Sequence, residues 1–457
     1  MPIVFNSTDL EVIEYATVKR RNVYLQGSGG TGKSYLMAEI TKRLRERGVK
    51  VAITATTGAA AVNVGGTTVH RFAGIGLGMD EKFRLLKRVR SKKPYIERWK
   101  ETDVLIIDEI SMMGGSLFDK IEYVGRNVRN PKSQKPFAGM QIIVSGDMLQ
   151  LSPIHDCWVF ESECWDRIEF KTFNLIESKR YEDRDHFSML LRVREAEHTS
   201  NDLELLRSRY DEYHRIKDFA AWEIKPTIIY SYKVDVAKYN EDELGHIPGK
   251  PTIFKSIDEF VFKHGDGTKD QKEYYKKVLS DGIPEIIALK DGAQVILKKN
   301  IDVEAGLING SRGVIIKINP VSRVVTVKFC NGVLSPIGIE MWEIDDDDAI
   351  VCRNQIPLIL GWASTVHSLQ GSTLDLAVCD IGQSIFAPGQ AYVAMSRVRT
   401  IEGLFLSEFD PKVIKVDAKA RKFVRSINNA SVSETEGDTE ADPKSKSHSH
   451  IEFEEEE

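Results

Sequence analysis

Residues 22–39 read NVYLQGSGGTGKSYLMAE, and this stretch decides the fold. Its apolar beginning predicts a buried strand, and the residues that follow Lys33 predict a helix. Between them lies the pattern GxxxxGK[ST], in which glycines allow backbone N–H groups to surround phosphate oxygens. The N-terminus of the helix adds a dipole that favours a bound anion. The stretch therefore predicts a phosphate-binding loop inside an α/β domain.

Two reactive side chains complete this loop. Lys33 would place a positive charge on the β- and γ-phosphates of a nucleotide, and the Ser34 hydroxyl would bind Mg²⁺. The predicted nucleotide-binding residues of the loop are Gly27, Gly29, Gly30, Thr31, Gly32, Lys33 and Ser34. A glycine-rich turn with an accidental Lys-Ser pair is the alternative, although the strand and helix around the loop argue against it.

A second strand pattern, DVLIIDE at residues 103–109, ends in two adjacent carboxylates. Asp108 would hold Mg²⁺ directly or through water. Glu109 would then take a proton from the attacking water, which is the group that a nucleotide hydrolase needs. An exposed acidic pair at the end of a strand is the alternative interpretation.

The segment VSGDMLQLSPI at residues 144–154 follows another apolar run and places Gln150 among apolar neighbours. A buried Gln needs partners for both its amide donor and its carbonyl acceptor. Gln150 would reach the γ-phosphate from the end of this strand, or it would bond to the backbone of its own turn. Arg180 and Arg397 are candidate arginine fingers, which would stabilise transition-state charge from a second domain.

The composition is that of an intracellular globular protein. The chain has 457 residues, of which 42% are hydrophobic and 29% charged, enough for two or three domains. Its apolar runs are shorter than the roughly 18 residues of a membrane span, and its N-terminus lacks the features of a signal or transit peptide. Five cysteines without a CxxC pair are expected to be reduced thiols. We therefore expect a soluble protein of the nucleus or cytoplasm, of cellular or viral origin.

Alternating strand and helix patterns predict two α/β domains with parallel sheets. Short strands separated by Gly and Asn turns follow the second domain's first half and predict an inserted β-barrel. The expected bounds are residues 1–175 for the first domain with a small insertion near 70–80, 176–289 and 351–425 for the second, and 290–350 for the barrel.

Residues 426–457 are polar, Ser-rich and acidic, which predicts a disordered tail. The tail would either bind a protein partner or keep the protein soluble. Residues 430–457 carry a net charge of −8, so the remaining chain has a net charge of +3 although the whole chain carries −5. That balance is compatible with a local basic groove for nucleic acid. The other acidic run, at residues 345–348, is predicted to be a solvated turn.

Taken together, these segments resemble the PIF (petite integration frequency) family of DNA helicases within superfamily 1B. The resemblance runs from about residue 3 to residue 410, in the order of the family's motifs. The most discriminating segment is SLFDKIEYVGRNVRNPKSQKPFAGMQIIVSGD at residues 116–147. The other matching segments are GSGGTGKS, ITATTGAAAVNVGGTTVHRFAGIGLG (53–78), DEISM (108–112), SGDMLQLSPI, ASTVHSLQGSTLD (363–375) and FAPGQAYVAMSRVRT (386–400).

The resemblance implies an ATP-dependent helicase that moves 5′ to 3′ on single-stranded DNA and unwinds duplex DNA. ATP and Mg²⁺ would bind in the cleft between two RecA-like domains. The inserted barrel would match the family's Src-homology-like domain, and residues 70–78 would form a wedge at the duplex junction. The catalytic positions would be Lys33, Asp108, Glu109 and Gln150 in the first domain and Arg180 and Arg397 in the second, with Gln370 at the nucleotide. Roles in repair, recombination, replication and telomere maintenance are implied by the resemblance alone.

By the same resemblance, DNA would contact Thr57, Gly58, His70, Phe72, Thr365 and His367. Hydroxyls and backbone amides at loop ends suit phosphates, and aromatic rings stack on bases without reading their sequence. The alternatives are a core aromatic for Phe72 and a structural histidine for His367. The expected partners are single-stranded and forked DNA, bound by a monomer.

Three positions depart from the family's pattern. Asp9 stands where the family often has a Gln that reads adenine, and a carboxylate accepts hydrogen bonds without donating them, so the strictness of ATP preference is open. Tyr181 stands in place of a Gln, and Ser152 in place of a Pro. Two other functions stay open: a nucleic-acid-stimulated ATPase that remodels complexes without unwinding, and a nucleotide-dependent binding module without hydrolysis.

Overall fold

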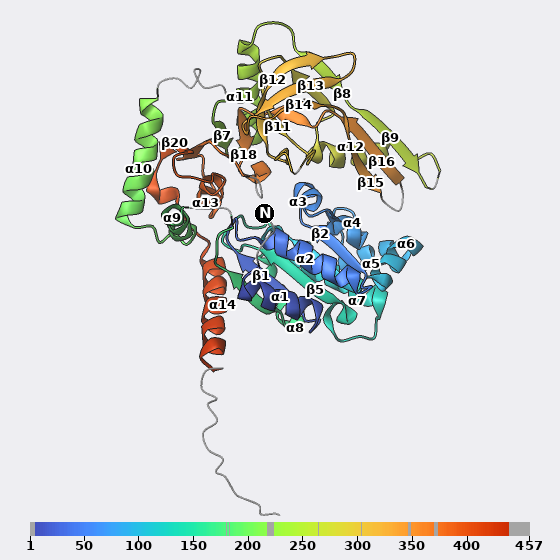
Figure 1. The fold of residues 1–457 in the computed structure, drawn as a ribbon. Coiled ribbons are helices and arrows are strands. Elements are labelled where there is room, and N and C mark those ends of the chain that lie inside the picture. The colour runs from blue at the N-terminus through green and yellow to red at the C-terminus, as the bar shows by residue number, and fades with distance from the viewer. Residues whose placement is uncertain are drawn as a thin grey trace, which may run out of the picture.

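The computed structural model describes residues 5–179, 181, 183–216, 224–263, 265–302, 304–345, 349–369 and 373–437. Within these residues the chain forms two α/β lobes and an all-antiparallel insertion, and a C-terminal helix runs back along the first lobe (Figure 1). No helix among the described residues combines the length and the apolar character that crossing a bilayer demands.

The first lobe is built on a six-stranded parallel sheet in the order β3-β2-β4-β5-β1-β6. Its strands are β1 (Val23–Gly27), β2 (Val51–Ala55), β3 (Thr67–Thr68), β4 (Val104–Asp108), β5 (Gln141–Gly146) and β6 (Lys171–Leu175). Strands β1, β4 and β5 are buried along their whole length, as their continuous apolar runs predict for parallel strands covered on both faces.

Two separate apolar cores cover the two faces of this sheet. Val23 and Leu25 of β1 pack with α1 (Ser7–Thr17) and α2 (Lys33–Glu46). Tyr24 points to the opposite face because successive strand residues alternate. That second core is closed by the helices α4 (Val69–Ala73), α5 (Lys82–Arg90), α6 (Lys93–Glu101), α7 (Gly115–Arg129) and α8 (Trp165–Ile168). The layered arrangement brings the carboxyl ends of β1, β4 and β5 to one edge.

The second lobe is a four-stranded parallel sheet in the order β18-β7-β19-β20. Its strands are β7 (Thr227–Tyr230), β18 (Ala363–Thr365), β19 (Ala377–Ile381) and β20 (Leu404–Phe409), and its helices are α9 (Arg184–Arg194), α10 (Ser200–Arg215), α11 (Lys233–His246) and α13 (Gln390–Met395). Leu151, which directly follows Gln150, belongs to the core of this lobe together with residues of α9. The two lobes are therefore packed together at the end of β5.

The insertion between α11 and β18 is longer than the sequence predicts. Its strands are β8 (Thr252–Lys255), β9 (Ile257–Phe262), β10 (Ile286–Leu289), β11 (Gln294–Leu297), β12 (Arg312–Asn319), β13 (Val324–Phe329), β14 (Leu334–Ile337), β15 (Glu340–Asp345), β16 (Ala349–Gln355) and β17 (Leu358–Leu360), with the helix α12 (Lys269–Gly282). One core joins all of them, so the predicted start at residue 290 is wrong by about 40 residues. The long-range pairing of β9 with β16, which no local pattern announces, explains the error.

The insertion also differs from a closed barrel. Its strands form sheets of five, three and two members, and in the described part of the chain β14 and β17 are the edges of the five-stranded sheet. The predicted barrel closure is therefore not seen. Of the acidic run, Asp345 ends β15, and residues 346–348 lie outside the described residues.

The helix α14 (Ala418–Gly437) corrects the prediction that disorder begins at residue 426. Phe423 stacks on Phe160 of the first lobe with ring centroids 4.2 Å apart, and the Trp158 indole donates to Asp417 Oδ1 at 3.2 Å. The apolar residues Ala420, Phe423, Val424 and Ile427 recur at helical spacing and face the first lobe's core. Because most other residues of the segment are polar, these four apolar positions do not lead to the prediction of a helix. Residues 438–457, which hold most of the predicted tail, lie outside the described part.

Candidate nucleotide site and nucleic-acid interface

The phosphate-binding loop connects β1 to α2 in the conformation that its glycines require. Gly30 and Gly32 have φ values of 88° and 87°, a region that favours glycine. A Cβ atom on Gly27 would lie 2.7 Å from Thr31 Oγ1 and 2.9 Å from the Leu175 carbonyl oxygen, so a side chain does not fit there. The Ser28 hydroxyl is buried and has no hydrogen-bond partner among the described residues. These features fit a loop that surrounds phosphate oxygens.

Lys33 lies inside the loop at the N-terminus of α2. Its Nζ atom donates to the carbonyl oxygens of Gly27 at 2.7 Å and of Ser28 at 3.0 Å. Burial lowers the pKa of Lys33, and the nearby carboxylates of Asp147, Glu109 and Asp108 oppose that shift. The negative charges of these three acidic residues therefore help to keep the Lys33 ammonium group protonated. Ser34 is exposed beside it.

Asp108 and Glu109 stand at the end of β4 on the same side as the loop. One Asp108 oxygen, Oδ1, accepts from Ser145 Oγ at 2.8 Å and from the Glu109 backbone N–H at 2.9 Å. Burial raises the pKa of Asp108, and these two hydrogen bonds oppose the shift. Carboxylate and hydroxyl oxygens are the ligands that Mg²⁺ prefers, so Asp108 and Ser34 form a suitable donor pair for it.

Glu109 adopts a left-handed backbone conformation with φ 53° and ψ 43°. This conformation is uncommon for a residue other than glycine and costs of order 1 kcal/mol. The Thr56 hydroxyl donates to the Glu109 carbonyl at 3.0 Å and holds the strained residue in place. Residues held in such conformations cluster at functional sites, and Glu109 stays a candidate for the predicted proton acceptor.

Gln150 donates its side-chain amide to Asp147 Oδ2 at 3.1 Å. Asp147 is fully buried, and its carboxylate also accepts from Arg194, at the C-terminal end of α9 in the second lobe. Burial alone would raise the pKa of Asp147, but the charge and hydrogen bonds of Arg194 lower it. Gln150 therefore donates to an ionised carboxylate of its own turn. From the sequence, only the backbone of the turn is expected as a partner within the first domain.

Arg194 was not predicted from the sequence. It lies in LLRVREAEH, where Arg192 and Arg194 look alike. Arg192 pairs with Asp202 and its side chain is 40% exposed, whereas Arg194 is 6% exposed. The signal that separates them is helical spacing, since Leu190 and Val193 are buried on the side of α9 that continues to Arg194.

Through α13 and the residue before it, the second lobe contacts both the phosphate-binding loop and the turn that carries Gln150. The Gly29 backbone N–H donates to the Tyr392 hydroxyl at 3.2 Å. Gly389, at the start of α13, lies so close to the turn that a Cβ atom there would be 2.5 Å from the Gln150 carbonyl oxygen. Burial raises the pKa of Tyr392, which stays a neutral hydroxyl. A nucleotide on the loop would therefore lie at the boundary of the two lobes.

The structure places Arg397 inside the second lobe. Its guanidinium donates to the Val393 carbonyl at 2.8 Å, the Leu369 carbonyl at 3.3 Å and Ser396 Oγ at 2.7 Å, and the residue is 1% exposed. Its prediction as an arginine finger is therefore not met in this arrangement, and such a role would require these bonds to exchange. Arg180 and Gln370 lie outside the described residues.

Asp9 forms an ion pair and Tyr181 a hydrogen bond within the protein, and Asp9 lies near the phosphate-binding loop. Asp9 Oδ2 lies 3.4 Å from Lys179 Nζ, and the Lys179 backbone N–H donates to the Gly30 carbonyl at 2.8 Å. The Tyr181 hydroxyl donates to the Ser396 carbonyl at 2.5 Å. Asp9 is thus connected to the loop through a cation.

The predicted DNA-contacting residues divide into accessible and buried ones. Gly58 is exposed at the start of α3 (Gly58–Asn63), and the Thr57 hydroxyl accepts from the Ala60 N–H at 3.2 Å. Phe72 is 2% exposed and packs edge to face on Trp99 with centroids 4.8 Å apart. Its predicted stacking on DNA bases is wrong. Phe72 lies on the same side of α4 as the buried residues Val69 and Ala73, so its ring points into the core of the first lobe.

Two further predicted residues lie at the end of β18. Thr365 is 4% exposed, and its hydroxyl lies 2.7 Å from the Ser368 hydroxyl. That hydroxyl also accepts from the Ser368 backbone N–H at 3.1 Å, which caps the short helix from His367 to Leu369. Thr365 is therefore engaged in a local turn. The side chain of His367 is not among those described.

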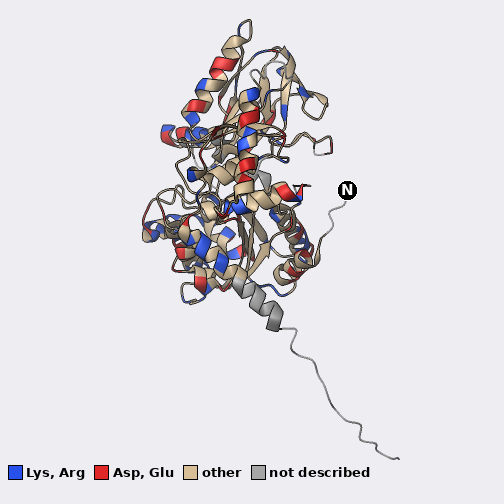
Figure 2. Cartoon of the chain, turned by 90° about the vertical axis from the view of Figure 1, so that its left-hand side faces the viewer, with Lys and Arg blue, Asp and Glu red and all other residues tan. Residues whose placement is uncertain are grey.

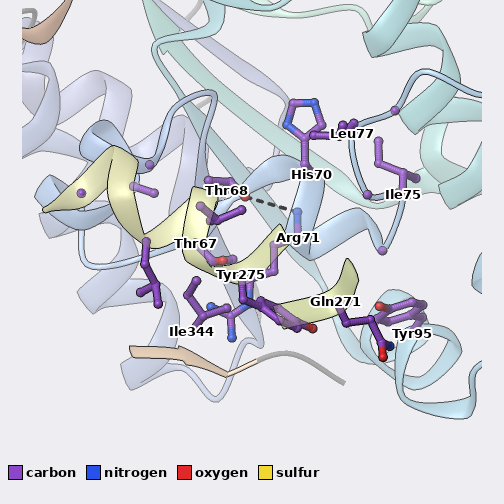
Figure 3. A pocket seen from close by; sticks show the side chains of 18 of the residues that line it. Thr67, Thr68, His70, Arg71, Ile75, Leu77, Tyr95, Gln271, Tyr275 and Ile344 are labelled. Carbon is purple, nitrogen blue, oxygen red and sulfur yellow. Dashed lines mark hydrogen bonds between the residues drawn. The ribbon is translucent and has the colours of Figure 1, made fainter. Parts of the chain in front are cut away.

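A cavity of about 600 Å³ separates the predicted wedge from the insertion (Figure 3). His70 lines it and is half-buried, and burial lowers the pKa of His70, which favours the neutral ring. The lining residues labelled in Figure 3 are Thr67, Thr68, His70, Arg71, Ile75, Leu77 and Tyr95 from the first lobe and Gln271, Tyr275 and Ile344 from the insertion. Aromatic, cationic and hydroxyl groups therefore meet between these two parts of the chain.

A basic segment borders this cavity. Residues 80–101, which contain α5 and α6, hold nine Lys and Arg against four Asp and Glu. Arg84, Lys87 and Arg88 are exposed, and the Arg88 guanidinium would lie 3.0 Å from a Cβ atom on Gly76. Along the ribbon drawn in Figure 2, by contrast, blue Lys and Arg segments alternate with red Asp and Glu segments. The net positive charge beside the wedge suits a phosphate backbone.

Comparisons with known proteins agree with these features. The sequence model of the PIF1-like helicase family matches residues 8–204, and that of the 2B domain of DNA helicase Pif1 matches residues 273–318. The ATP-dependent DNA helicase PIF1 of Xenopus laevis is 35% identical over 433 residues, which cover 92% of this chain. The chain spans 64% of the length of that relative.

Solved structures share the fold. The crystal structure of the Pif1 helicase from Candida albicans has a TM-score of 0.76 and 31% identity, and the match covers 93% of this chain and 100% of that one. The Pif1 helicase from Bacteroides in complex with ADP-AlF3 and ssDNA has a TM-score of 0.64 and 26% identity, with 94% of this chain and 98% of that one covered.

Proposed function

Because the chain belongs to the PIF1-like helicase family, we propose that it is an ATP-dependent DNA helicase. In this proposal it moves 5′ to 3′ on single-stranded DNA and unwinds duplex DNA. The observation that carries the proposal is the contact of the second lobe with two segments of the first lobe: with the phosphate-binding loop through Tyr392 and Gly29, and with the turn after β5 through Arg194 and Asp147. A nucleotide bound at such a boundary couples its hydrolysis to the relative position of the lobes.

In the proposed mechanism, residues of the first lobe provide the groups that bind the phosphates, hold the metal ion and accept the proton. The loop N–H groups and Lys33 would bind the phosphates, and Ser34 and Asp108 would hold Mg²⁺. The bound Mg²⁺ would neutralise charge on the β- and γ-phosphates. Glu109, whose backbone is fixed by Thr56, would accept the proton of the attacking water. Gln150 would then respond to the presence of the γ-phosphate.

The DNA would run along the edge where the wedge, the insertion and the basic segment meet. His70, Thr57 and Gly58 are the predicted contacts that the structure leaves accessible or partly accessible. Exposed cations such as Lys87 and Arg88 would bind phosphates without reading the base sequence. The crystal structure of the Bacteroides relative with ADP-AlF3 and ssDNA supports a joint site for nucleotide and single strand. The tail segment that would bind a protein partner lies mostly outside the described residues.

Gln150→Ala is expected to lower single-stranded DNA-stimulated ATP turnover by at least about 10-fold, because one preorganised donor at the reacting phosphate is lost. Nucleotide binding is expected to stay within about 3-fold, since the loop and Lys33 are unchanged. Steady-state hydrolysis with and without DNA, together with binding of a fluorescent ATP analogue, measures both quantities.

Gln134→Ala is the matched control, because Gln134 is an exposed amide of the same lobe. It is expected to behave as the wild type. Stimulated turnover in Gln150→Ala equal to that of the control would remove Gln150 from the mechanism.

The proposed function is tested by ATP hydrolysis with no nucleic acid, with single-stranded DNA and with RNA of the same sequence. The proposal predicts strong stimulation by DNA. Equal stimulation by RNA and DNA without strand separation would favour the remodelling ATPase. Nucleotide binding without hydrolysis under every condition would favour the binding module.

A further inference from the structure

The contact between Asp147 and Arg194 is a buried ion pair that joins the two lobes. Arg194 Nη2 lies 2.6 Å from Asp147 Oδ1, and Arg194 Nε lies 3.0 Å from Oδ2. The side chains are 7% and 0% exposed. The geometry is that of a guanidinium donating two parallel bonds to one carboxylate, which fixes direction as well as distance.

Asp147 also organises the turn that carries Gln150. Its Oδ1 atom accepts from Gln26 Nε2 at 3.1 Å and from the Leu149 backbone N–H at 3.2 Å. Its Oδ2 atom accepts from Gln150 Nε2 at 3.1 Å. The Gln150 amide therefore bonds to a carboxylate that is held by Gln26 and Leu149 from the first lobe and by Arg194 from the second.

We propose that Arg194 is a positioning residue for ATP hydrolysis: it holds Asp147, through which it orients Gln150, and so transmits the state of the nucleotide to α9. This inference rests on the proposed ATPase activity. It adds a residue that acts through Asp147 and that links the turn after β5 to the second lobe.

The place of Arg194 in the fold supports this role. It is the last residue of α9, a helix whose Met189, Leu190 and Val193 share a core with Leu151 of the first lobe. A change in the position of the second lobe would therefore move Arg194 and the backbone next to Gln150 together. Interiors are too closely packed to absorb such a movement without a change at Asp147.

A role in stability alone explains the pair less well. Apolar side chains of similar volume often stabilise a core as well as a buried ion pair does, because burying two charges is costly. The pair also lies close enough to Lys33 to affect it, since the charge of Asp147 raises the pKa of Lys33 and that of Arg194 lowers it. A charged, directional contact at this place is suited to orienting a neighbour.

The test compares Arg194→Lys and Arg194→Gln with Arg192→Gln. Arg192 is two residues away on α9 and makes a bidentate pair with Asp202 at 2.6 and 2.7 Å, but its own side chain is 40% exposed and the pair lies within the second lobe. For the Arg194 variants we expect kcat with single-stranded DNA to fall about 10- to 100-fold, the scale of a misplaced reacting group. Binding of a fluorescent ATP analogue should stay within about 3-fold. Arg192→Gln should match the wild type in both.

Each Arg194 change is also made in the Gln150→Ala background. If Arg194 acts through Gln150, its replacement should lower kcat less than about 2-fold further there, because residues that act as a unit are not additive. A purely structural residue would lower the melting temperature and the bound fraction of nucleotide in both backgrounds. Arg194→Lys keeps the charge and serves where Arg194→Gln does not fold.

The outcomes separate the inference from the proposed function. Arg194→Lys with the kcat of Arg192→Gln, or an equal loss of kcat in both backgrounds, overturns the role of Arg194 while the ATPase stands. Absence of hydrolysis in the wild type overturns the proposed function and this inference with it. A loss confined to backgrounds that contain Gln150 establishes the positioning role.

Discussion

Lys33→Ala is expected to lower DNA-stimulated ATP hydrolysis by at least about 100-fold, the cost of removing a preorganised charge from a phosphate site. Lys33 Nζ lies within 3.0 Å of two loop carbonyls, so it is already placed inside the loop that would receive the phosphates. The same substitution should weaken ATP binding, because the positive charge acts in the ground state as well. Phosphate release with and without single-stranded DNA measures the first effect, and fluorescent-nucleotide titration the second.

Lys42→Ala is the control for this prediction. Lys42 is an exposed lysine on the same helix, α2, and its removal should leave hydrolysis within about 2-fold of the wild type, as surface substitutions usually do. If Lys33→Ala and Lys42→Ala both kept wild-type hydrolysis, the loop would not be the site of the reaction.

Glu109→Gln is expected to lower kcat by about 10²- to 10⁴-fold, the usual contribution of a general base. The substitution keeps the volume and the strained backbone of Glu109 but removes the proton acceptor. ATP binding should be retained, since Ser34, Asp108 and Lys33 are unchanged. Single-turnover hydrolysis and nucleotide binding, measured on the same preparation, separate the two effects.

Glu101→Gln provides the comparison for Glu109→Gln. Glu101 is an exposed carboxylate of the same lobe that pairs with Lys50 at 3.0 Å. Its replacement should leave kcat unchanged, because exposed ion pairs contribute about 0–1 kcal/mol to stability and this one is remote from the loop. A Glu109→Gln protein that hydrolyses ATP at the rate of Glu101→Gln would assign the proton transfer to another group.

The local parts of the fold and site follow from the sequence because they depend on neighbours in the chain. The apolar runs of β1, β4 and β5 predict buried parallel strands, and the glycines before Lys33 predict the loop between a strand and a helix. The two carboxylates at the end of β4 fall at the same sheet edge as the loop for the same reason. These predictions need no knowledge of distant contacts.

The parts that could not be predicted depend on distant contacts. Phe72 and Arg194 have partners far away in the sequence, Trp99 and Asp147, which decide that one is a core ring and the other a buried cation. The bounds of the insertion depend on the pairing of β9 with β16, about 90 residues apart. Arg397 illustrates a further limit, since its predicted role belongs to an arrangement in which its bonds to Val393 and Leu369 would be exchanged.

The most direct test of the account is strand separation on duplexes with a single-stranded tail at either the 5′ or the 3′ end. With ATP and Mg²⁺, the wild type should unwind the 5′-tailed duplex and leave the 3′-tailed duplex intact, and Lys33→Ala should unwind neither. Unwinding from the 3′ tail would contradict the proposed direction. Hydrolysis that is stimulated by DNA but separates neither duplex would contradict the helicase itself.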